Sequence, residues 1–171
     1  LVGLTYTPDT FACGVDIVGP SNLETLLSTI PPYWAPVVAQ FHERMGNPNT
    51  PEGKQLLIDA SPLYKADQIV KPLLIGQGAN DPRVNQAESD QIVEAMKAKN
   101  IPVTYVLFPD EGHGFAKPSN NIAFNAVTEN FLATCLGGRA EPIADTIEES
   151  TAQIEEGADF VQGLKAAIDA D

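Results

Sequence analysis

Three short apolar runs, each followed by a helical pattern, constrain the fold of this chain more than any other feature. The runs cover residues 11–19, 72–78 and 103–108, and glycine, proline or polar turn residues bound them. Apolar runs of this length without polar alternation are typical of strands that are buried on both faces of a parallel sheet. Strands separated by helices therefore predict an α/β fold, with a parallel sheet covered by helices on both faces.

Helical periodicity fills the intervals between the runs and follows the last one. It covers residues 21–30, 34–45, 52–60, 85–99 and 120–136. Asn85 and Glu88 resemble a capping box at the start of the fourth helix, and Ser119 or Asn120 is expected to cap the fifth. Each predicted strand is thus followed by a helical connection, as parallel pairing requires.

Composition places the chain among globular proteins and argues against two classes of partner. The 171 residues amount to about one domain, and 43% of them are apolar. Ten Lys and Arg stand against 23 Asp and Glu, a net charge of −13, which opposes binding to nucleic acid or to an anionic membrane surface. No stretch approaches the roughly 18 apolar residues of a membrane-spanning helix. We therefore expect neither nucleic acid nor a membrane as partner.

Acidic residues are concentrated near the end of the chain. Residues 140–171 hold nine acids and one base, and Gly137 and Gly138 precede them. This pattern is typical of a solvated extension. The predicted organisation is a packed α/β unit over residues 1–139 and an acidic C-terminal extension over residues 140–171.

The two cysteines, Cys13 and Cys135, lie far apart in the sequence and in apolar surroundings. Their spacing matches neither a metal-binding knuckle nor a dense disulfide framework. Their oxidation state and the redox compartment of the chain therefore stay open at the level of the sequence.

Two polar loops follow the second and third predicted strands. The loop at residues 78–84 carries Asp81, and the loop at residues 109–115 carries His113. Ligands of parallel α/β sheets bind at the carboxyl ends of the strands, and neighbouring strands lie about 4.8 Å apart. Asp81 and His113 are therefore expected within side-chain reach of each other. A carboxylate that orients an imidazole is the acid–base part of a hydrolytic triad, in the chain order Asp then His.

The motifs around these two residues resemble those of prolyl oligopeptidase family serine peptidases, most closely the acylaminoacyl-peptidase and dipeptidyl-peptidase branch. The similar segments are GQGANDPRV at 76–84, PDEGHGF at 109–115, SPLY at 61–64 and RMGNP at 44–48. The resemblance covers residues 1–139 and implies the C-terminal half of an α/β-hydrolase catalytic domain. It implies Asp81 as the triad acid, His113 as the triad base, and cleavage of short peptides without a metal or an organic cofactor.

The nucleophile of that family, a serine in a G-x-S-x-G turn, is missing from the 171 residues. None of the six serines has glycine at both positions of this pattern. We expect the chain to begin just after this turn in a longer protein, and to be inactive as a peptidase by itself while its parent is active. The strand at residues 11–19 then lacks one neighbour, and its bare edge predicts self-association of the chain.

Four further residues are candidate substrate contacts. Tyr33 and Trp34 follow two prolines in a region that, in the family, approaches the P1 side chain of the substrate. Core packing is the alternative for both aromatic residues. Arg83 and Val84 lie just past Asp81, where they can reach substrate, and a local carboxylate is the alternative partner of Arg83.

Three functional interpretations remain. The chain is part of a serine exopeptidase or oligopeptidase, part of an esterase or other acyl hydrolase on the same scaffold, or a non-enzymatic domain whose acidic extension is its working surface. The motifs favour the peptidase. No metal site is predicted, because Asp110 and Glu111, the two acids nearest His113 in the sequence, are adjacent loop residues of a kind that is usually solvated.

Overall fold

The computed structural model describes residues 1–169, which form one four-stranded sheet flanked by helices. The strands, in spatial order, are β1 (Gly14–Ile17), β2 (Leu73–Gly78), β3 (Val103–Phe108) and β4 (Gln153–Glu156). β1, β2 and β3 run parallel, and β4 is antiparallel to β3. The predicted α/β class and its parallel sheet are confirmed, and β4 is an addition that the sequence did not predict.

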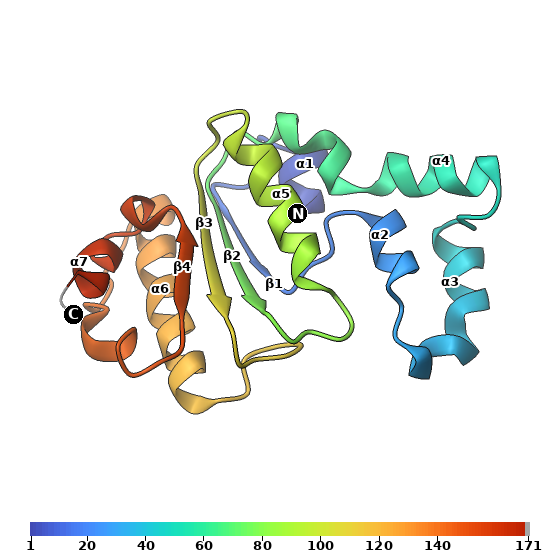
Figure 1. Ribbon diagram of the computed structural model, residues 1–171. Helices are drawn as coiled ribbons and strands as arrows, with labels where there is room; N and C mark the ends of the chain where they lie inside the picture. Colours follow the sequence, from blue (N-terminus) through green and yellow to red (C-terminus); the bar gives the residue numbers. More distant parts are fainter. Residues whose placement is uncertain (170–171) are drawn as a thin grey trace.

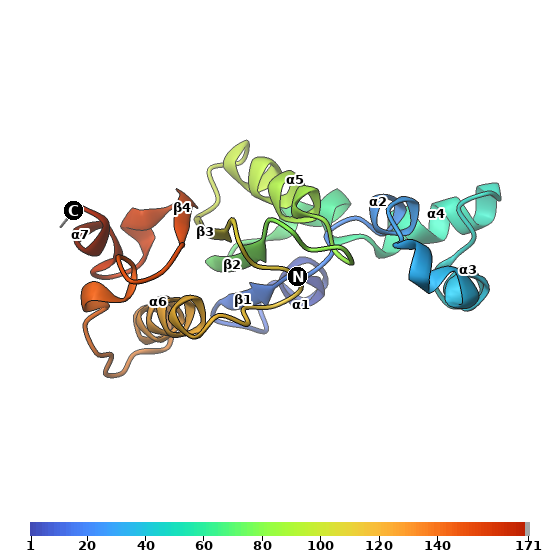
Figure 2. The same ribbon diagram turned by 60° about the horizontal axis from the view of Figure 1, so that its bottom comes forward.

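Helices cover both faces of the sheet, as Figures 1 and 2 show. α5 (Gln86–Lys97) lies on one face together with α1 (Val2–Tyr6) and the 3-10 helix η2 (Pro62–Gln68). α6 (Pro118–Leu136) and α7 (Leu164–Ile168) lie on the other. Every residue of β2 and β3 is buried between these layers, which explains why both strands read as unbroken apolar runs. No helix within residues 1–169 is both long enough and apolar enough to cross a membrane.

The core consists of two apolar layers, because successive side chains of a strand point to opposite faces of the sheet. In β2 and β3 the odd-numbered core residues face α5 and the even-numbered ones face α6. The strand residues of the α5 layer are Leu73, Ile75, Val103, Tyr105 and Leu107, and those of the α6 layer are Leu74, Val106 and Phe108. Ile92, Val93 and Met96 form the buried stripe by which α5 packs on its layer.

Two helix starts differ from the prediction. The side chain of Asn85 makes no capping hydrogen bond at the start of α5, and Lys117 rather than Ser119 or Asn120 precedes α6. Glu88 and Asn120 are instead buried and bond to segments that are distant in sequence. These long-range hydrogen bonds replace the local caps that the sequence pattern indicated.

The segment between β1 and β2 forms an arm that extends to the side of the sheet (Figures 1 and 2). Its helices are α2 (Leu23–Ser28), the 3-10 helix η1 (Pro32–Val37), α3 (Val38–Met45) and α4 (Pro51–Ala60), close to the three predicted helices. The two ends of the arm meet beside the sheet. The backbone N–H of Leu23 donates to Ser61 Oγ at 2.8 Å, and that of Leu63 donates to the Ser21 carbonyl at 2.9 Å.

Residues 140–169, called here the C-terminal segment, pack against the sheet. The segment contains the 3-10 helices η3 (Ala144–Thr146) and η4 (Ala158–Phe160) besides β4 and α7. The expectation of a solvated extension is wrong for this segment, because its few apolar side chains reach the core beside α6. Those buried are Ile143, Ile147, Val161 and Leu164. The last two residues of the predicted extension, 170–171, lie outside the described residues, and the division of the chain near residue 139 stays a prediction.

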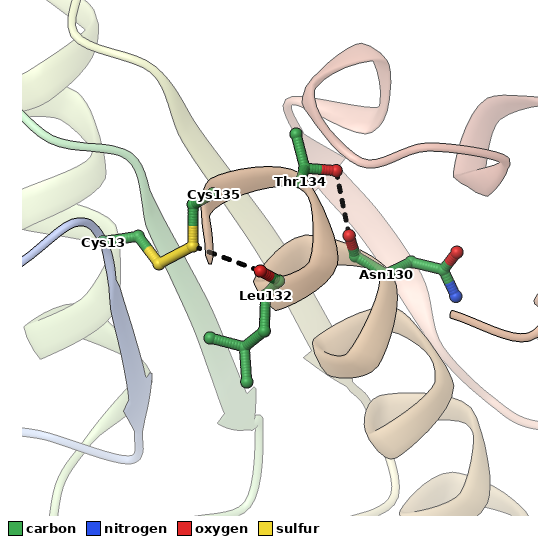
Figure 3. The surroundings of a disulfide bond; sticks show 5 residues. All are labelled: Cys13, Asn130, Leu132, Thr134 and Cys135. Carbon is green, nitrogen blue, oxygen red and sulfur yellow. Dashed lines mark hydrogen bonds between the residues drawn. A yellow bond between two sulfur atoms is a disulfide. The ribbon is translucent and has the colours of Figure 1, made fainter. Parts of the chain in front are cut away.

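A disulfide joins Cys13 to Cys135, whose Cα atoms lie 6.2 Å apart (Figure 3). Cys13 directly precedes β1, and Cys135 lies in the last turn of α6. The bond links positions 122 residues apart and ties the outer strand β1 to the helix that covers it. It lies at the amino end of β1, away from the carboxyl ends of the strands.

Candidate active site

Asp81 and His113 touch at the carboxyl ends of β2 and β3. The Nδ1 atom of His113 lies 2.8 Å from Oδ2 of Asp81, so the imidazole donates a hydrogen bond to the carboxylate. The Asp81 side chain is fully buried, and the His113 side chain is 32% exposed. The sequence prediction that these two side chains lie within reach of each other is therefore confirmed. The partly exposed imidazole leaves its Nε2 atom available to a further group.

The loop after β2 fixes the Asp81 carboxylate. Oδ1 of Asp81 accepts the backbone N–H groups of Arg83 at 2.8 Å and of Val84 at 2.9 Å. Aspartate often closes a turn in this way, two and three residues ahead in the chain. Oδ2 remains for His113, so one carboxylate both closes the turn and binds the histidine. A carboxylate held through one oxygen presents the other in a defined direction.

Main-chain hydrogen bonds join the loop that carries Asp81, residues 78–84, to the histidine loop, defined here as residues 109–117. The N–H of Ala79 donates to the Phe108 carbonyl at 3.0 Å, and the N–H of Asn80 donates to the Glu111 carbonyl at 2.9 Å. The loops approach so closely that a β-carbon at Gly78 would overlap the carbonyl oxygen of Gly112. The spacing of Asp81 and His113 is therefore set by the backbone of two adjacent strands.

Aromatic packing holds the part of the histidine loop that follows His113. Gly114 has a φ of +106°, in the region that favours glycine, so the motif needs glycine directly after the histidine. The next residue, Phe115, packs with ring centroids 4.6 Å from Phe108 of β3 and 4.8 Å from Phe124 of α6. These contacts anchor the loop two residues beyond the imidazole.

Two carboxylates precede His113, and hydrogen bonds favour the ionised form of both by lowering their pKa values. Asp110 accepts the Lys117 ammonium, the Thr151 hydroxyl and the Asn120 amide, which together lower the pKa of Asp110 to about 2. Burial alone raises the pKa of Glu111. The Asn120 amide at 2.9 Å and the backbone N–H groups of Lys117 at 2.8 Å and Ala116 at 3.0 Å outweigh burial and lower the pKa of Glu111 overall. The expectation that adjacent loop acids are solvated is wrong for Glu111, which is buried.

Tyr33 and Trp34 lie in η1, within the arm. Tyr33 is 58% exposed, which rules out core packing for this residue. The two rings meet edge to face at 6.2 Å, and Trp34 packs on Phe41 at 5.6 Å. A substrate contact of Tyr33 and Trp34 stays a prediction.

Arg83 and Val84 lie beside Asp81 and differ in exposure. Val84 is buried, and its carbonyl accepts the Gln77 amide at 3.1 Å. The guanidinium of Arg83 forms no ion pair within the described residues, so the alternative of a local carboxylate partner finds no support there. Both residues serve Asp81 through their backbone, and substrate binding by their side chains stays a prediction.

Glu88 is a buried carboxylate whose role the sequence did not reveal. It accepts the backbone N–H groups of Ser21 at 3.0 Å and Asn22 at 2.8 Å, together with the Thr25 hydroxyl. Asn22 in turn caps α2. Glu88 therefore attaches the start of the arm to α5, and its partners lie more than 60 residues away, beyond the reach of a local motif.

A metal centre is not indicated by the described side chains. Within residues 1–169, no group of three or more His, Cys, Asp or Glu side chains is arranged to hold a metal ion. Asp81 and His113 bond to each other, and Asp110 and Glu111 bond to Lys117 and Asn120. The arrangement is an oriented imidazole at the rim of a parallel sheet.

Comparison with known proteins matches residues 1–139 to the Prolyl oligopeptidase family. The chain is 71% identical over 168 residues to dipeptidyl aminopeptidase BIII of Pseudoxanthomonas mexicana, covering 98% of this chain and 24% of that protein. It is 55% identical over 143 residues to dipeptidyl peptidase family member 6 of Caenorhabditis elegans, covering 83% of this chain and 19% of the relative. The chain thus spans less than a quarter of the length of either relative.

Solved structures show the same relationship. A puromycin-hydrolyzing peptidase of Mycobacterium tuberculosis superposes with a TM-score of 0.68 at 26% identity, over 77% of this chain and 19% of that one. The residues that match the family model, 1–139, contain the three parallel strands, both loops and the two residues that meet at the strand ends. The chain belongs to the prolyl oligopeptidase family.

Proposed function

We propose that this chain supplies the acid and the base of a serine-peptidase triad in a longer protein that releases dipeptides from peptide substrates. The contact of His113 Nδ1 with Asp81 Oδ2 at 2.8 Å carries the proposal. The identity of 71% to a dipeptidyl aminopeptidase supports the class of substrate. The chain covers 24% of that relative, so the remainder of such an enzyme lies outside these 171 residues.

In the proposed reaction, His113 takes a proton from the attacking serine and then gives it to the leaving amine. The Asp81 carboxylate keeps the proton of the imidazole on Nδ1 and stabilises the imidazolium that forms during attack. Nε2 is then the atom that receives the serine proton. Partial exposure of His113 and full burial of Asp81 suit these roles, since only the imidazole has to meet the other reacting groups.

The serine of the triad belongs to a segment outside this chain in the proposal. None of the six serines present stands in a G-x-S-x-G pattern. Tyr33, Trp34, Arg83 and Val84 are the proposed substrate contacts of this part of the enzyme. The 171-residue chain is therefore proposed to be inactive by itself, because none of its serines stands in the nucleophile pattern.

The test compares hydrolysis of a dipeptidyl p-nitroanilide by the longer protein, by its His113→Ala variant and by the 171-residue chain. We expect kcat/KM to fall at least about a thousandfold in His113→Ala, because a triad works as a unit. His42→Ala is the matched control and should stay within about twofold of the wild type. Activity of His113→Ala near the wild-type value, or turnover by the short chain that His113→Ala abolishes, contradicts the proposal. Turnover of an acyl ester together with no turnover of the dipeptidyl anilide by the longer protein favours the esterase alternative.

We also propose that the 171-residue chain self-associates through the outer edge of β1. Within the described residues β1 pairs with β2 alone, so its other edge presents free backbone groups. Ile17 of β1 and Phe11 just before it are about half exposed. An apolar residue beside unpaired backbone groups favours pairing with a second chain.

The net charge of the chain, −13, supports the further proposal that the protein binds neither nucleic acid nor membranes.

A further inference from the structure

The histidine loop is bonded to a part of the chain that lies outside the family match. The match ends at residue 139, and the C-terminal segment begins at residue 140. Thr151 of this segment bonds to Asn120 of α6 and to Asp110 of the histidine loop. The support of His113 therefore extends beyond the residues that define the family.

Asn120 is the centre of this hydrogen-bond network. It is fully buried, and its amide nitrogen donates to Glu111 Oε1 at 2.9 Å and to Asp110 Oδ1 at 3.1 Å. Its amide oxygen accepts the backbone N–H of Thr151 at 2.9 Å. The Thr151 hydroxyl lies 3.1 Å from the same oxygen and shares its single proton between this oxygen and Asp110 Oδ1. Both ends of one amide are thus used, and they join the histidine loop to the C-terminal segment. These contacts also fix which end of the amide carries oxygen, since its partners are carboxylates on one side and an N–H on the other.

The position of Thr151 follows from the pairing of β4 with β3. Gln153 of β4 lies opposite Leu107 near the carboxyl end of β3. In an antiparallel pair, a residue two positions before Gln153 lies opposite one two positions after Leu107, at the start of the histidine loop. The edge strand therefore delivers Thr151 to the loop through backbone hydrogen bonds, independently of the Thr151 side chain.

We propose that Asn120 is a positioning residue for His113, and that Thr151 completes the hydrogen bonds by which Asn120 holds the histidine loop against Asp81. The inference rests on the proposed function, since it concerns the orientation of the same imidazole. Within the described residues Asn120 forms no hydrogen bond with His113, and it acts through Asp110 and Glu111, which lie three and two residues before His113.

The physical reason is the cost of leaving Glu111 short of donors. Its buried carboxylate accepts three hydrogen bonds, and Asn120 provides the one that comes from outside the loop. A buried charge that loses a donor regains water by loosening its surroundings. The loop that carries His113 then opens more often, although the Asp81 carboxylate itself stays fixed by the backbone of Arg83 and Val84.

The experiment observes the imidazole of His113 by ¹H–¹⁵N NMR in the 171-residue chain, which contains one other histidine, His42, as internal reference. The two quantities are the fraction of neutral imidazole with its proton on Nδ1 and the rate at which that proton exchanges with water. The variants are Thr151→Val, Thr151→Ser as conservative rescue, and Asn120→Ala. Thr146→Val is the matched control, because the Thr146 hydroxyl bonds locally to the Ile143 carbonyl within the same segment.

We expect the Nδ1 proton to exchange about three- to tenfold faster in Thr151→Val, the effect of losing one hydrogen bond, and faster still in Asn120→Ala. Thr151→Ser and Thr146→Val should stay within about twofold of the wild type. The Thr151 side chain is exposed, so Thr151→Val tests the inference even if Asn120→Ala fails to fold.

Unchanged exchange and tautomer in Thr151→Val, or an equal change in Thr146→Val, overturns the positioning role while leaving the proposed function standing. The tautomer of the wild-type imidazole tests both proposals together. If the wild-type imidazole carries its proton mainly on Nε2, then the Asp81–His113 hydrogen bond is missing, and both the proposed function and this inference fail.

Discussion

At the scale of single residues, Asp81 shows how one side chain serves folding and chemistry together. Its two oxygens have separate partners: one closes the turn after β2, and the other binds His113. A glutamate would place its carboxylate one methylene further along and could not hold both sets of partners in the same geometry. Asp110 and Glu111, which precede His113 in the sequence, connect the histidine loop to Asn120 of α6.

The ionisation of these two acids predicts a loss of stability at low pH. Their pKa values are lower in the folded chain than their ordinary values near 4, to about 2 for Asp110. Their contribution to the free energy of unfolding is therefore present above about pH 4 and is lost as the pH falls, for Asp110 toward about pH 2. Urea unfolding at pH 5, 4, 3 and 2.5 measures this loss. Asp110→Asn should show a shallower decline than the wild type, and an identical decline in both proteins contradicts the assignment.

At the scale of elements, burial decides what the sequence could predict. β2 and β3 were predictable because both faces are covered, which leaves unbroken apolar runs between turn residues. β4 was not, since Gln153–Glu156 contains two acids and one apolar residue, Ile154, and forms a strand because the edge of β3 is available. The contact of Asp81 with His113 was predictable from strand order alone. The network of Asn120 and the contacts of Glu88 were not, since their partners lie in other segments.

The disulfide ties β1 to α6, two elements that are distant in the sequence, and it gives a quantitative prediction. A bond between residues 122 positions apart restricts the unfolded chain strongly, which corresponds to about 4–5 kcal/mol in the chain-entropy description. We expect dithiothreitol to lower the free energy of unfolding of the wild type by this order, measured by urea denaturation. Cys13→Ser should show the lower stability without reductant and no further change with it. Equal stability of oxidised and reduced wild type contradicts the prediction.

At the scale of the whole molecule, the sheet has two unlike edges. The C-terminal segment covers the outer edge of β3 with β4, whereas β1 has a partner on one side only within residues 1–169. The arm extends to the side of the sheet in both views of the molecule (Figures 1 and 2). Self-association of the chain is therefore expected at the β1 edge.

Sedimentation velocity at increasing protein concentration tests this expectation. The wild type should shift from monomer to dimer or larger species, more readily at high salt, which screens repulsion between chains with a net charge of −13. Ile17→Lys should stay monomeric, because a charge on an edge strand opposes pairing. Ile122→Lys changes a similarly exposed isoleucine on α6 and should behave like the wild type. A wild type that stays monomeric throughout, or equal behaviour of the two variants, contradicts the β1 interface.

The most direct test of the triad assignment is kcat/KM of Asp81→Asn in the longer protein, on a dipeptidyl p-nitroanilide. Asparagine keeps an oxygen for the N–H groups of Arg83 and Val84, but it turns an amide N–H toward His113 and so favours the wrong imidazole tautomer. We expect kcat/KM to fall about 10⁴-fold with the fold intact. A value within about tenfold of the wild type would show that the Asp81–His113 pair does not drive hydrolysis.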